Sequence, residues 1–381
     1  MIKILLLIDY SSEFDRKLLR GLVQYSKENG PWLFYRLPSY YSAMHGEQGI
    51  LRWAKEWKAD AIIGQWNNDT IDLQKELNIP VVLQNYHHRS VTYSNLTGDY
   101  KGTGRMAAQF FAKRMFRNFA YFGVKGVVWS DERCEGYRQE VKRIGGEFFS
   151  FESDKQEDEI RMEVSRWLQE LPKPVALFCC DDAHALFISE TCKMTNIPIP
   201  EDIALLGVDN DELMCNISDP PISSIELEVE KGGYSIGRLV HRQIKKEHEG
   251  TFNIVINPIR IELRQSTEKH NIKDPYILEV VKYIESHYSS DLTIESLLAN
   301  IPLSRRNFEV KFKNALNTSI YQYILNCRCN HLADLLLTTD RPLADLAMEV
   351  GFTDYNNIAR IFKKFKGCSP IEYRQKKTRQ R

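Results

Sequence analysis

The chain has 381 residues, enough for two or three domains, and its 51 basic and 51 acidic residues give a formal net charge of zero. The charge is unevenly placed: residues 271–381 carry 17 basic and 12 acidic residues (net +5), and residues 1–270 carry 34 and 39 (net −5). A basic C-terminal part fits a nucleic-acid partner for that part only. No stretch approaches ~20 consecutive apolar residues, which excludes a membrane-spanning helix.

The N-terminal run MIKILLLIDY is too short for a signal peptide and has no small-residue cleavage site, so we expect a cytoplasmic protein. The eight cysteines form no C-x-x-C pair, and most lie within apolar runs such as LFCCDD. We therefore expect reduced, buried thiols, no zinc or other metal site, and no cofactor.

Short apolar runs alternate with helical patterns over the first two thirds of the chain, which indicates parallel βαβ units. We expect strands at residues 3–8, 32–37, 59–64, 81–84, 118–123, 147–149, 175–180, 203–208 and 259–263. We expect helices at residues 14–28, 100–115, 133–145, 156–170 and 183–195.

Polar side chains follow several of these strands, where sheets of this type bind ligands. Carboxylates, amides and an arginine beside aromatic residues suit a sugar, because each sugar hydroxyl is both donor and acceptor and aromatic faces cover the C–H side of the ring. For any single aspartate, capping a helix is the commoner role, so the hypothesis depends on several residues falling at equivalent strand ends. The candidate ligand-binding residues are Asp9, Tyr10, Asp15, Arg16, Gln65, Asp99, Arg133, Asp181, Asp209 and Asn210.

Three segments resemble LacI-type regulators and periplasmic sugar-binding proteins. They are IPIPEDIALLGVDNDEL, SDERCEGYRQEVKRIG and LTGDYKGTGRMAAQFFAKRMFRNFAYFG. The resemblance implies a two-lobed, type I periplasmic-binding-protein-like α/β sensor domain. It places Asp99, Arg133, Asp181 and Asp209 at ligand-contacting positions, with Asp181 where asparagine is commonest. Tyr10, Asp15 and Arg16 follow no general family pattern and are placed in the cleft by location alone.

The boundary of this domain is predicted from composition. Residues 1–265 form the expected sensor domain, and residues 266–273 are nearly free of apolar side chains and are expected to be a linker. Asp274 and Pro275 then start a helix, which opens an all-α domain over residues 274–381.

Two helix-turn-helix motifs are predicted in the C-terminal domain, at about residues 293–316 and 342–366. In the second, apolar residues repeat at spacings of three and four on both sides of Gly351, and amide, aromatic and basic side chains lie between them. An ordinary helical hairpin would show the same periodicity, so the pattern alone leaves both interpretations open.

The segment GFTDYNNIARIFKKFKGCSPIEYR resembles the signature of AraC-type transcription factors, with Ile358 where phenylalanine is usual. That family places its two recognition helices in successive major grooves, roughly 34 Å apart. The resemblance implies base reading by Arg306, Glu309, Tyr355, Asn356 and Arg360, and a phosphate contact for Arg328. The candidate DNA-binding residues are Ser304, Arg305, Arg306, Asn307, Glu309, Arg328, Asp354, Tyr355, Asn356, Asn357, Arg360, Lys363 and Lys364.

A LacI-like sensor joined to an AraC-type reader resembles pentose-responsive activators. This implies a dimeric regulator of catabolic genes, with D-xylose as the expected effector and promoter DNA and RNA polymerase as partners. Two alternatives stay open: a regulator sensing another pentose, a hexose or a nucleoside, and a sugar-processing enzyme using paired acids such as Asp181 and Asp182. Against the enzyme, the sequence has no nucleophile–base set, glycine-rich phosphate loop or metal-spaced cluster.

Overall fold

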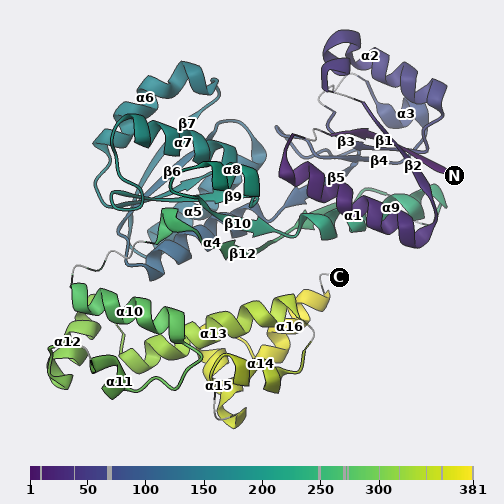
Figure 1. The fold of residues 1–381 in the computed structure, drawn as a ribbon. Helices are drawn as coiled ribbons and strands as arrows, with labels where there is room; N and C mark the ends of the chain where they lie inside the picture. Colours follow the sequence, from purple (N-terminus) through teal and green to yellow (C-terminus); the bar gives the residue numbers. More distant parts are fainter. Residues whose placement is uncertain are drawn as a thin grey trace. The chain divides into compact units, whose positions relative to one another are not determined.

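The computed structural model describes residues 1–8, 11–37, 39–66, 71–247, 250–268, 272, 274–299, 301–316, 318–339, 341–352 and 355–379. For residues 39–45, 74, 334, 337–338, 355–356 and 375–379 it describes the backbone path alone. The chain divides into two compact units, Met1–Lys269 and His270–Arg381 (Figure 1). Each unit is described by itself.

The first unit contains two lobes, each built on a six-stranded sheet (Figure 1). The sheet of the first lobe has the strand order β11-β5-β4-β3-β1-β2, and all of its pairings are parallel. Its strands are β1 (Ile2–Leu7), β2 (Trp32–Arg36), β3 (Ala61–Gly64), β4 (Val81–Leu83), β5 (Ser94–Gly98) and β11 (Asn253–Ile256).

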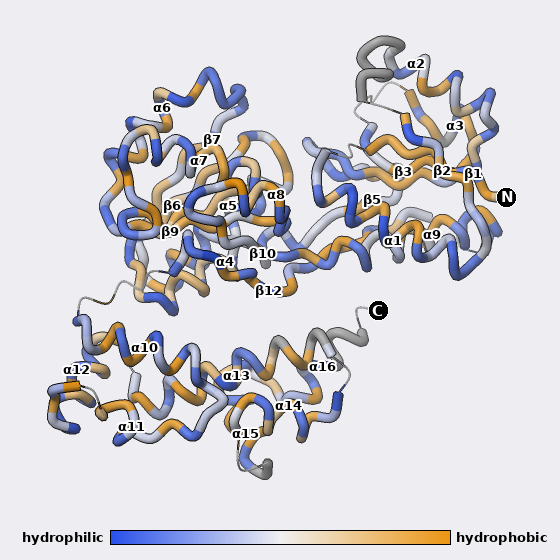
Figure 2. Tube along the Cα trace, in the orientation of Figure 1, coloured by the Kyte–Doolittle hydropathy of each residue, from blue (hydrophilic) through white to orange (hydrophobic). Residues whose placement is uncertain are grey.

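The sheet of the second lobe has the order β12-β10-β9-β8-β6-β7 and is parallel except for the β10–β12 pair. Its strands are β6 (Asn118–Val124), β7 (Glu147–Ser153), β8 (Val175–Cys179), β9 (Ile203–Val208), β10 (Ser223–Leu227) and β12 (Pro258–Glu262). Strands β8 and β9 are buried at every position, as expected of central strands covered on both faces, and the strands of both sheets are largely orange in Figure 2.

Helices connect the parallel strands, as right-handed crossovers require. The helices of the first lobe are α1 (Glu13–Asn29), α2 (Ser39–Trp57), α3 (Leu73–Leu77) and α9 (Val229–Ile244). Those of the second lobe are α4 (Tyr100–Lys113), α5 (Val128–Arg143), α6 (Glu157–Glu170), α7 (Asp182–Met194) and α8 (Glu212–Ile217), and the short 3₁₀ helix η1 (Gln265–Thr267) ends the unit.

The chain crosses between the lobes three times, after β5, after β10 and after β11. Backbone hydrogen bonds join these crossings: Asp99 N donates to Ile256 O at 2.9 Å, and Glu228 N donates to Asn257 O at 3.0 Å. Asn257 Nδ2 also donates to Glu228 Oε1 at 2.6 Å. The three crossings therefore form one hydrogen-bonded hinge at the base of the two lobes.

Helices α4 and α5 approach each other closely through glycines. A Cβ atom at Gly104 would lie 2.1 Å from Arg133 O, and one at Gly136 would lie 2.1 Å from Lys101 O. Only a residue without a side chain leaves room for the facing backbone at these positions. The contact fixes the position of the α5 turn that carries Arg133.

The second unit is all helical and contains two helix-turn-helix pairs, α11–α12 and α14–α15, joined by α13 (Figure 1). Buried apolar residues such as Leu332, Leu346 and Phe362 form the core around α13, α14 and α15. The helices are α10 (Pro275–His287), α11 (Ile294–Leu298), α12 (Arg305–Leu316), α13 (Ile320–Thr338), α14 (Leu343–Glu349), α15 (Tyr355–Lys366) and α16 (Pro370–Arg379).

The structure differs from the expected elements in three places. Helix α5 begins at Val128, five residues before the expected start at Arg133. Strands β5, β10 and β11 and helices α8 and α9 were not predicted, because their apolar runs are short and interrupted by polar residues. The first two residues of the expected linker (266–273) belong to the sensor domain. Ser266 and Thr267 are 0% and 1% exposed, and Ser266 Oγ donates to Leu205 O at 2.6 Å.

Within the described ranges, no helix combines the length and apolar character needed to cross a bilayer.

Candidate functional site

Arg133, on the first turns of α5, is the centre of the candidate ligand site. Its side chain is 4% exposed, and its guanidinium carbon lies 5.5 Å from the ring centres of Tyr100 and Trp129. Nη1 donates to Cys180 O, and Nη2 lies 3.7 Å from Asp209 Oδ1. Nε is buried and has no hydrogen-bond partner among the described residues. A buried guanidinium with an unused donor is suited to hold a polar ligand.

Asp209 follows β9 and faces Arg133. Its backbone φ is +101°, and that of Asn210 is +49°, both in the left-handed region that non-glycine residues rarely occupy. Oδ1 of Asp209 is buried without a hydrogen-bond partner among the described residues. Burial raises the pKa of Asp209 to about 6, although the nearby Arg133 opposes that rise. The carboxylate is thus held in a strained loop with an acceptor atom unused.

Asp181 and Asp182 lie side by side after β8 but have different roles. Asp182 is 1% exposed, and it accepts hydrogen bonds from Ser224 Oγ at 2.6 Å and Asp211 N at 2.8 Å. It therefore ties the loop after β9 to the sheet. Asp181 caps α7, and its Oδ1 accepts from both the backbone N (2.8 Å) and Nδ1 (2.7 Å) of His184.

The first lobe contributes to the same site through Gln65, which follows β3. Gln65 Nε2 donates to the Tyr86 hydroxyl at 2.5 Å, and the Tyr86 ring meets Trp129 edge to face with 6.4 Å between centres. Trp129 in turn covers Arg133. Residues following β3 and β4 of the first sheet and β8 and β9 of the second are thereby connected to one buried guanidinium.

This arrangement suits a small polyol. Carboxylate oxygens at Asp181 and Asp209 accept from hydroxyl groups, and Arg133 donates to a hydroxyl or ring oxygen. Tyr100 and Trp129 supply aromatic faces for the C–H surface of a sugar ring. The Cys180 thiol lies beside the His184 imidazole, but Cys180 is fully buried and burial raises the pKa of its thiol, so the arrangement favours binding over turnover.

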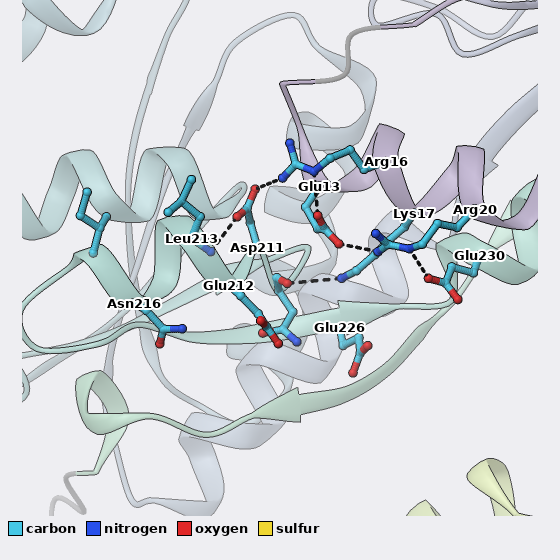
Figure 3. Close-up of a pocket in the computed structure, with 12 residues that line it drawn as sticks. Glu13, Arg16, Lys17, Arg20, Asp211, Glu212, Leu213, Asn216, Glu226 and Glu230 are labelled. Atoms are coloured by element: carbon cyan, nitrogen blue, oxygen red, sulfur yellow. Dashed lines mark hydrogen bonds and ion pairs between the residues drawn. The ribbon is translucent and has the colours of Figure 1, made fainter.

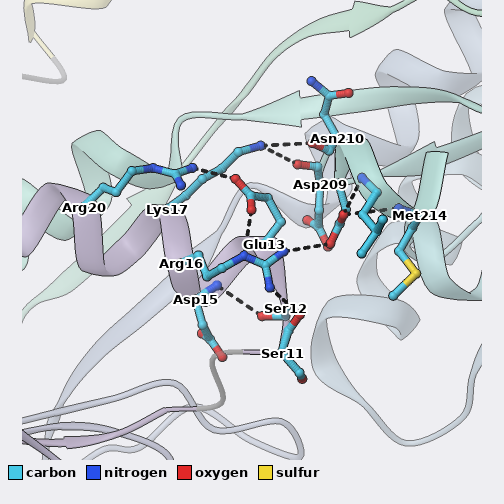
Figure 4. A network of polar contacts seen from close by, with 12 residues as sticks. Ser11, Ser12, Glu13, Asp15, Arg16, Lys17, Arg20, Asp209, Asn210 and Met214 are labelled. Atoms are coloured by element: carbon cyan, nitrogen blue, oxygen red, sulfur yellow. Dashed lines mark hydrogen bonds and ion pairs between the residues drawn. The ribbon is translucent and has the colours of Figure 1, made fainter. Parts of the chain in front are cut away.

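Polar contacts from α1 reach across to the second lobe beside this site (Figure 4). Lys17 Nζ donates to Asp209 O at 2.8 Å and to Asn210 O at 3.3 Å, and Arg16 Nη2 lies 3.3 Å from Asp211 Oδ2. A cavity of about 970 Å³ lies alongside, lined largely by charged residues of α1 and of the loop leading into α8 (Figure 3). Arg16 and Arg20 on its wall already pair with Glu13, Asp211 and Glu230, so we assign it to the contact between the lobes and not to the ligand.

A second set of contacts joins the lobes near α5. Arg89, in the loop after β4, makes a bidentate ion pair with Glu132 at 2.6 and 2.8 Å. Val128 N donates to Tyr86 O at 2.7 Å, and His87 Nδ1 lies 3.0 Å from Gly126 O. Bidentate arginine–carboxylate pairs have restricted geometry, so this set helps to fix how the lobes meet.

The predicted ligand residues fall into two groups. Gln65, Arg133, Asp181 and Asp209 are connected as described, whereas the others have different surroundings. Asp15 is 3% exposed, Arg16 lies in the contact between the lobes, and Asp99 is exposed and caps α4 by accepting from Gly102 N at 2.8 Å. Asn210 Oδ1 accepts from Arg264 Nη2 at 2.8 Å. Asp9 and Tyr10 lie outside the described residues.

Four contributors were missed from the sequence: Tyr86, Tyr100, Trp129 and His184. Tyr100 could have been predicted, because it is an aromatic residue that directly follows Asp99, a predicted ligand residue. Trp129 was missed because α5 was expected to start four residues after it. Tyr86 and His184 reach the site only through tertiary contacts.

Cys180, Asp181 and His184 have donor atoms within 4.8 Å of one another, a spacing that could hold a metal ion. The hydrogen bond between Asp181 and His184 accounts for their closeness, and Cys180 is fully buried. The expectation of no metal stays a prediction. All eight cysteines are free thiols in the structure.

The candidate DNA interface begins with α12. Ser304 Oγ accepts from Asn307 N at 3.4 Å and so caps the start of this helix. Phe308 and Phe312 are fully buried, which leaves Arg306 and Asn307 exposed. Arg305 pairs with Glu295 at 2.8 Å and Glu309 at 3.1 Å, so its charge is partly neutralised within the domain.

Helix α15 presents the second exposed face. Ile358 and Phe362 are buried, whereas Arg360, Lys363 and Lys364 are exposed, with Lys364 donating to Gln322 Oε1 at 2.9 Å. Asn357 is partly buried. Asp354 and the side chains of Tyr355 and Asn356 lie outside what the structure describes.

Arg328 has a structural role that the sequence did not reveal. Its Nε donates to Tyr288 O at 2.8 Å and its Nη2 to Ser290 O at 2.7 Å, which satisfies carbonyl groups where α10 ends. The predicted phosphate contact stays a prediction. His331, nearby, stacks on Tyr288 with 3.8 Å between ring centres.

Comparison with known protein families finds two matches. Residues 108–267 match a periplasmic binding protein-like domain, and residues 297–376 match a helix-turn-helix domain. The predicted architecture of a sensor followed by a helix-turn-helix reader is confirmed.

Relatives with the same architecture align over nearly the whole chain. The "Xylose operon regulatory protein" of Escherichia coli K12 is 24% identical, over 98% of this chain and 96% of its own length. The protein of the same name from Haemophilus influenzae is 23% identical, over 98% of each. A solved structure described as "xylose-binding transcription activator xylR" superimposes with a TM-score of 0.60 and 22% identity, covering 98% of this chain and 97% of that one.

These relatives are transcription regulators, and the chain shares their domain order from end to end. The prediction of a transcription regulator and not an enzyme is therefore confirmed by the comparisons.

Because the pKa of Asp209 is raised, the free energy of unfolding is predicted to depend on pH through this group. The folded state binds the Asp209 proton more tightly than the unfolded state, so the stability that this group contributes is present below pH ~4 and is lost as pH rises through about 6. Asp209→Asn removes the effect. We expect the free energy of unfolding of wild type, relative to Asp209→Asn, to fall by about 2 kcal/mol between pH 4.5 and 7.5. Urea unfolding at both pH values measures it, and parallel pH profiles would contradict it.

Proposed function

We propose that the chain is a cytoplasmic, D-xylose-responsive transcription activator that binds promoter DNA as a dimer and recruits RNA polymerase. One observation carries the proposal: Arg133 Nε and Asp209 Oδ1 are buried without hydrogen-bond partners among the described residues, and the Arg133 guanidinium lies 5.5 Å from the ring centres of Tyr100 and Trp129. Such atoms are expected to be satisfied by a bound polar molecule. The full-length likeness to xylose operon regulators supports a pentose as that molecule.

The sugar lies between the lobes, with hydroxyl groups donating to Asp209 and Asp181 and an oxygen accepting from Arg133. Lys17, from the other lobe, donates to the carbonyl groups of Asp209 and Asn210. A ligand that fixes the Asp209 side chain therefore favours the lobe arrangement in which Lys17 makes these bonds. Ligand binding and closure of the lobes are in this way one linked equilibrium.

The same loop is bonded to the segment that leaves the sensor. Arg264 Nη2 donates to Asn210 Oδ1 at 2.8 Å, and its Nη1 donates to Ile222 O at 2.9 Å. Directly after it, Ser266 and Thr267 are bonded to β9 and β10: Ser266 Oγ donates to Leu205 O, and the Ser223 and Thr267 hydroxyls lie 2.6 Å apart. Arg264 thus connects the effector loop to the residues that precede the DNA-binding unit.

In the DNA-binding unit, α12 and α15 are the two recognition helices. Arg306 and Arg360 suit guanine by bidentate geometry, Asn356 suits adenine, and Glu309 accepts from cytosine N4. The exposed lysines of α15 contact phosphates. Paired half-sites follow from a symmetric dimer.

A calorimetric titration with D-xylose tests the proposal. Wild type is expected to bind D-xylose, and Asp209→Ala to bind it at least about tenfold more weakly, because hydrogen bonds to a charged group are worth roughly 1.5–3 kcal/mol. Asp209→Ala keeps its affinity for DNA in the absence of sugar. Asp154→Ala, at an exposed aspartate of the same lobe, serves as the control and stays at wild-type affinity.

Unchanged affinity in Asp209→Ala would contradict the assigned site. Tighter binding of another pentose, a hexose or a nucleoside in the same titrations would replace D-xylose as the effector.

Removing the Arg264 guanidinium separates sugar binding from the DNA response. Arg264→Gln leaves Arg133, Asp181 and the Asp209 side chain in place, so D-xylose affinity is expected within about threefold of wild type. The sugar-dependent change in DNA affinity is expected to shrink by about fivefold or more, within the usual range of 1–3 kcal/mol for coupling between sites. Calorimetry and gel-shift titration measure the two quantities.

Arg260→Gln is the matched control, because Arg260 lies on β12 nearby, is half exposed and pairs with Glu226. A full DNA response in Arg264→Gln would show that the signal does not pass through this side chain.

Base reading by α15 is tested at Arg360. On an operator recovered by selection from random duplexes, Arg360→Ala is expected to lose about 1–3 kcal/mol and to relax specificity at one base pair. Lys363→Ala, exposed on the same helix, is expected to weaken binding to all sequences alike and to lower the salt dependence. An equal loss on operator and random DNA for Arg360→Ala would reject base reading there.

A further inference from the structure

The second lobe contains a histidine, His184, that binds the side chain of Asp181. His184 lies on the first turn of α7, three residues after Asp181, and both side chains are about one fifth exposed. Asp181 Oδ1 accepts from His184 N at 2.8 Å and lies 2.7 Å from His184 Nδ1. Because a carboxylate only accepts, Nδ1 carries the proton in this contact.

The two oxygens of Asp181 are used differently. Oδ1 is occupied by both bonds to His184, whereas Oδ2 has no hydrogen bond to any residue that the structure describes. The bond to Nδ1 prevents the carboxyl group from rotating freely about its Cβ–Cγ bond. Oδ2 is thereby held in one direction as an acceptor, and Asp181 lies close enough to Arg133 and Asp209 to interact with their charges.

We infer that His184 is a positioning residue of the effector site: it holds Asp181 charged and oriented, so that Oδ2 accepts from a hydroxyl of the bound sugar. This inference rests on the proposed function and deepens it. An aspartate at this position accepts only, so it requires a ligand hydroxyl that donates, whereas an asparagine could also donate. The His184–Asp181 pair thus contributes to the choice of ligand as well as to affinity.

The charges around the pair agree with this geometry. Burial alone would raise the pKa of Asp181, but His184 and, more weakly, Arg133 outweigh it and hold that pKa below its usual value. Burial opposes charge on His184 as well, yet its neighbours raise its pKa well above the usual value. Among these neighbours Cys180 acts most strongly on the pKa of His184 and the Asp181 carboxylate next, and burial raises the pKa of the Cys180 thiol itself.

Two more carboxyl groups act on the pair. Glu157, at the start of α6, faces His184, and its own pKa is raised by burial and lowered by His184. Asp209 follows β9, and burial, together with the charge of Asp181, raises its pKa to about 6. Any pH profile of sugar affinity therefore contains a contribution from Asp209, and only the ratio of a variant to wild type isolates His184.

The experiment is a calorimetric titration of the full chain with D-xylose at pH 5.5, 6.5 and 7.5. His184→Ala is expected to weaken binding about tenfold or more at pH 7.5, because the oriented acceptor is lost. The ratio to wild type is expected to grow further toward pH 5.5, since only the weaker effect of Arg133 then opposes the rise that burial causes in the pKa of Asp181. His184→Asn restores an amide donor at the Nδ1 position without charge, so it is expected to recover affinity at pH 7.5 but not at pH 5.5.

The coupling is measured in the Asp181→Asn background. There, His184→Ala is expected to change the dissociation constant by less than about twofold at every pH, because the carboxylate that His184 positions is absent. His287→Ala, at an exposed histidine of the C-terminal unit, is the control and is expected to match wild type.

A loss of affinity in His184→Ala that is equal in both backgrounds and independent of pH would overturn the inference and make His184 a residue of general stability. Wild-type affinity in both His184 variants would overturn it as well. A wild type that binds no pentose contradicts the proposed function and this inference together, whereas a wild type that binds D-xylose without His184–Asp181 coupling contradicts this inference alone.

Discussion

The first unit depends on the burial of one positive charge. Arg133 lies almost entirely out of solvent, and a buried guanidinium is stable only when oppositely charged or dipolar groups surround it. The structure supplies the Cys180 carbonyl, the Asp209 carboxylate and the faces of Tyr100 and Trp129. Because these come from different strand ends and helices, the charge requires the whole edge of the second sheet to be in place.

This constraint also links the ligand site to the motion of the lobes. Asp209 and Asn210 are strained, and they are held by Lys17 from the first lobe, by Arg264 near the end of the sensor, and by Asp182, which binds the following residue. A ligand that satisfies Asp209 acts on all of these contacts at once. This loop can couple ligand binding to the DNA-binding unit, because both the arrangement of the lobes and the segment that leaves the sensor after Arg264 favour the same conformation of its backbone.

Much of this could be predicted from the sequence. The alternation of apolar runs and helical periods placed β8, β9 and helix α7 between them, and the strand-end rule found Asp181 and Asp209. Arg133 was found from its place at an expected helix start and from the family resemblance. It could not distinguish Asp181 from Asp182, because their roles depend on whether a neighbour such as Ser224 donates to them. Tyr86 and His184 are invisible for the same reason, and Asp99 and Arg16 show that a position near a strand end can equally serve a cap or a contact between lobes.

The central claim is that a polyol bound between the lobes changes how the C-terminal helices bind DNA. The most direct measurement is the affinity and footprint of the full chain on its selected operator with and without saturating D-xylose. The account predicts a change in affinity of at least about fivefold, together with an altered footprint over the paired half-sites. Identical affinity and footprint, while calorimetry shows the sugar bound, would contradict it.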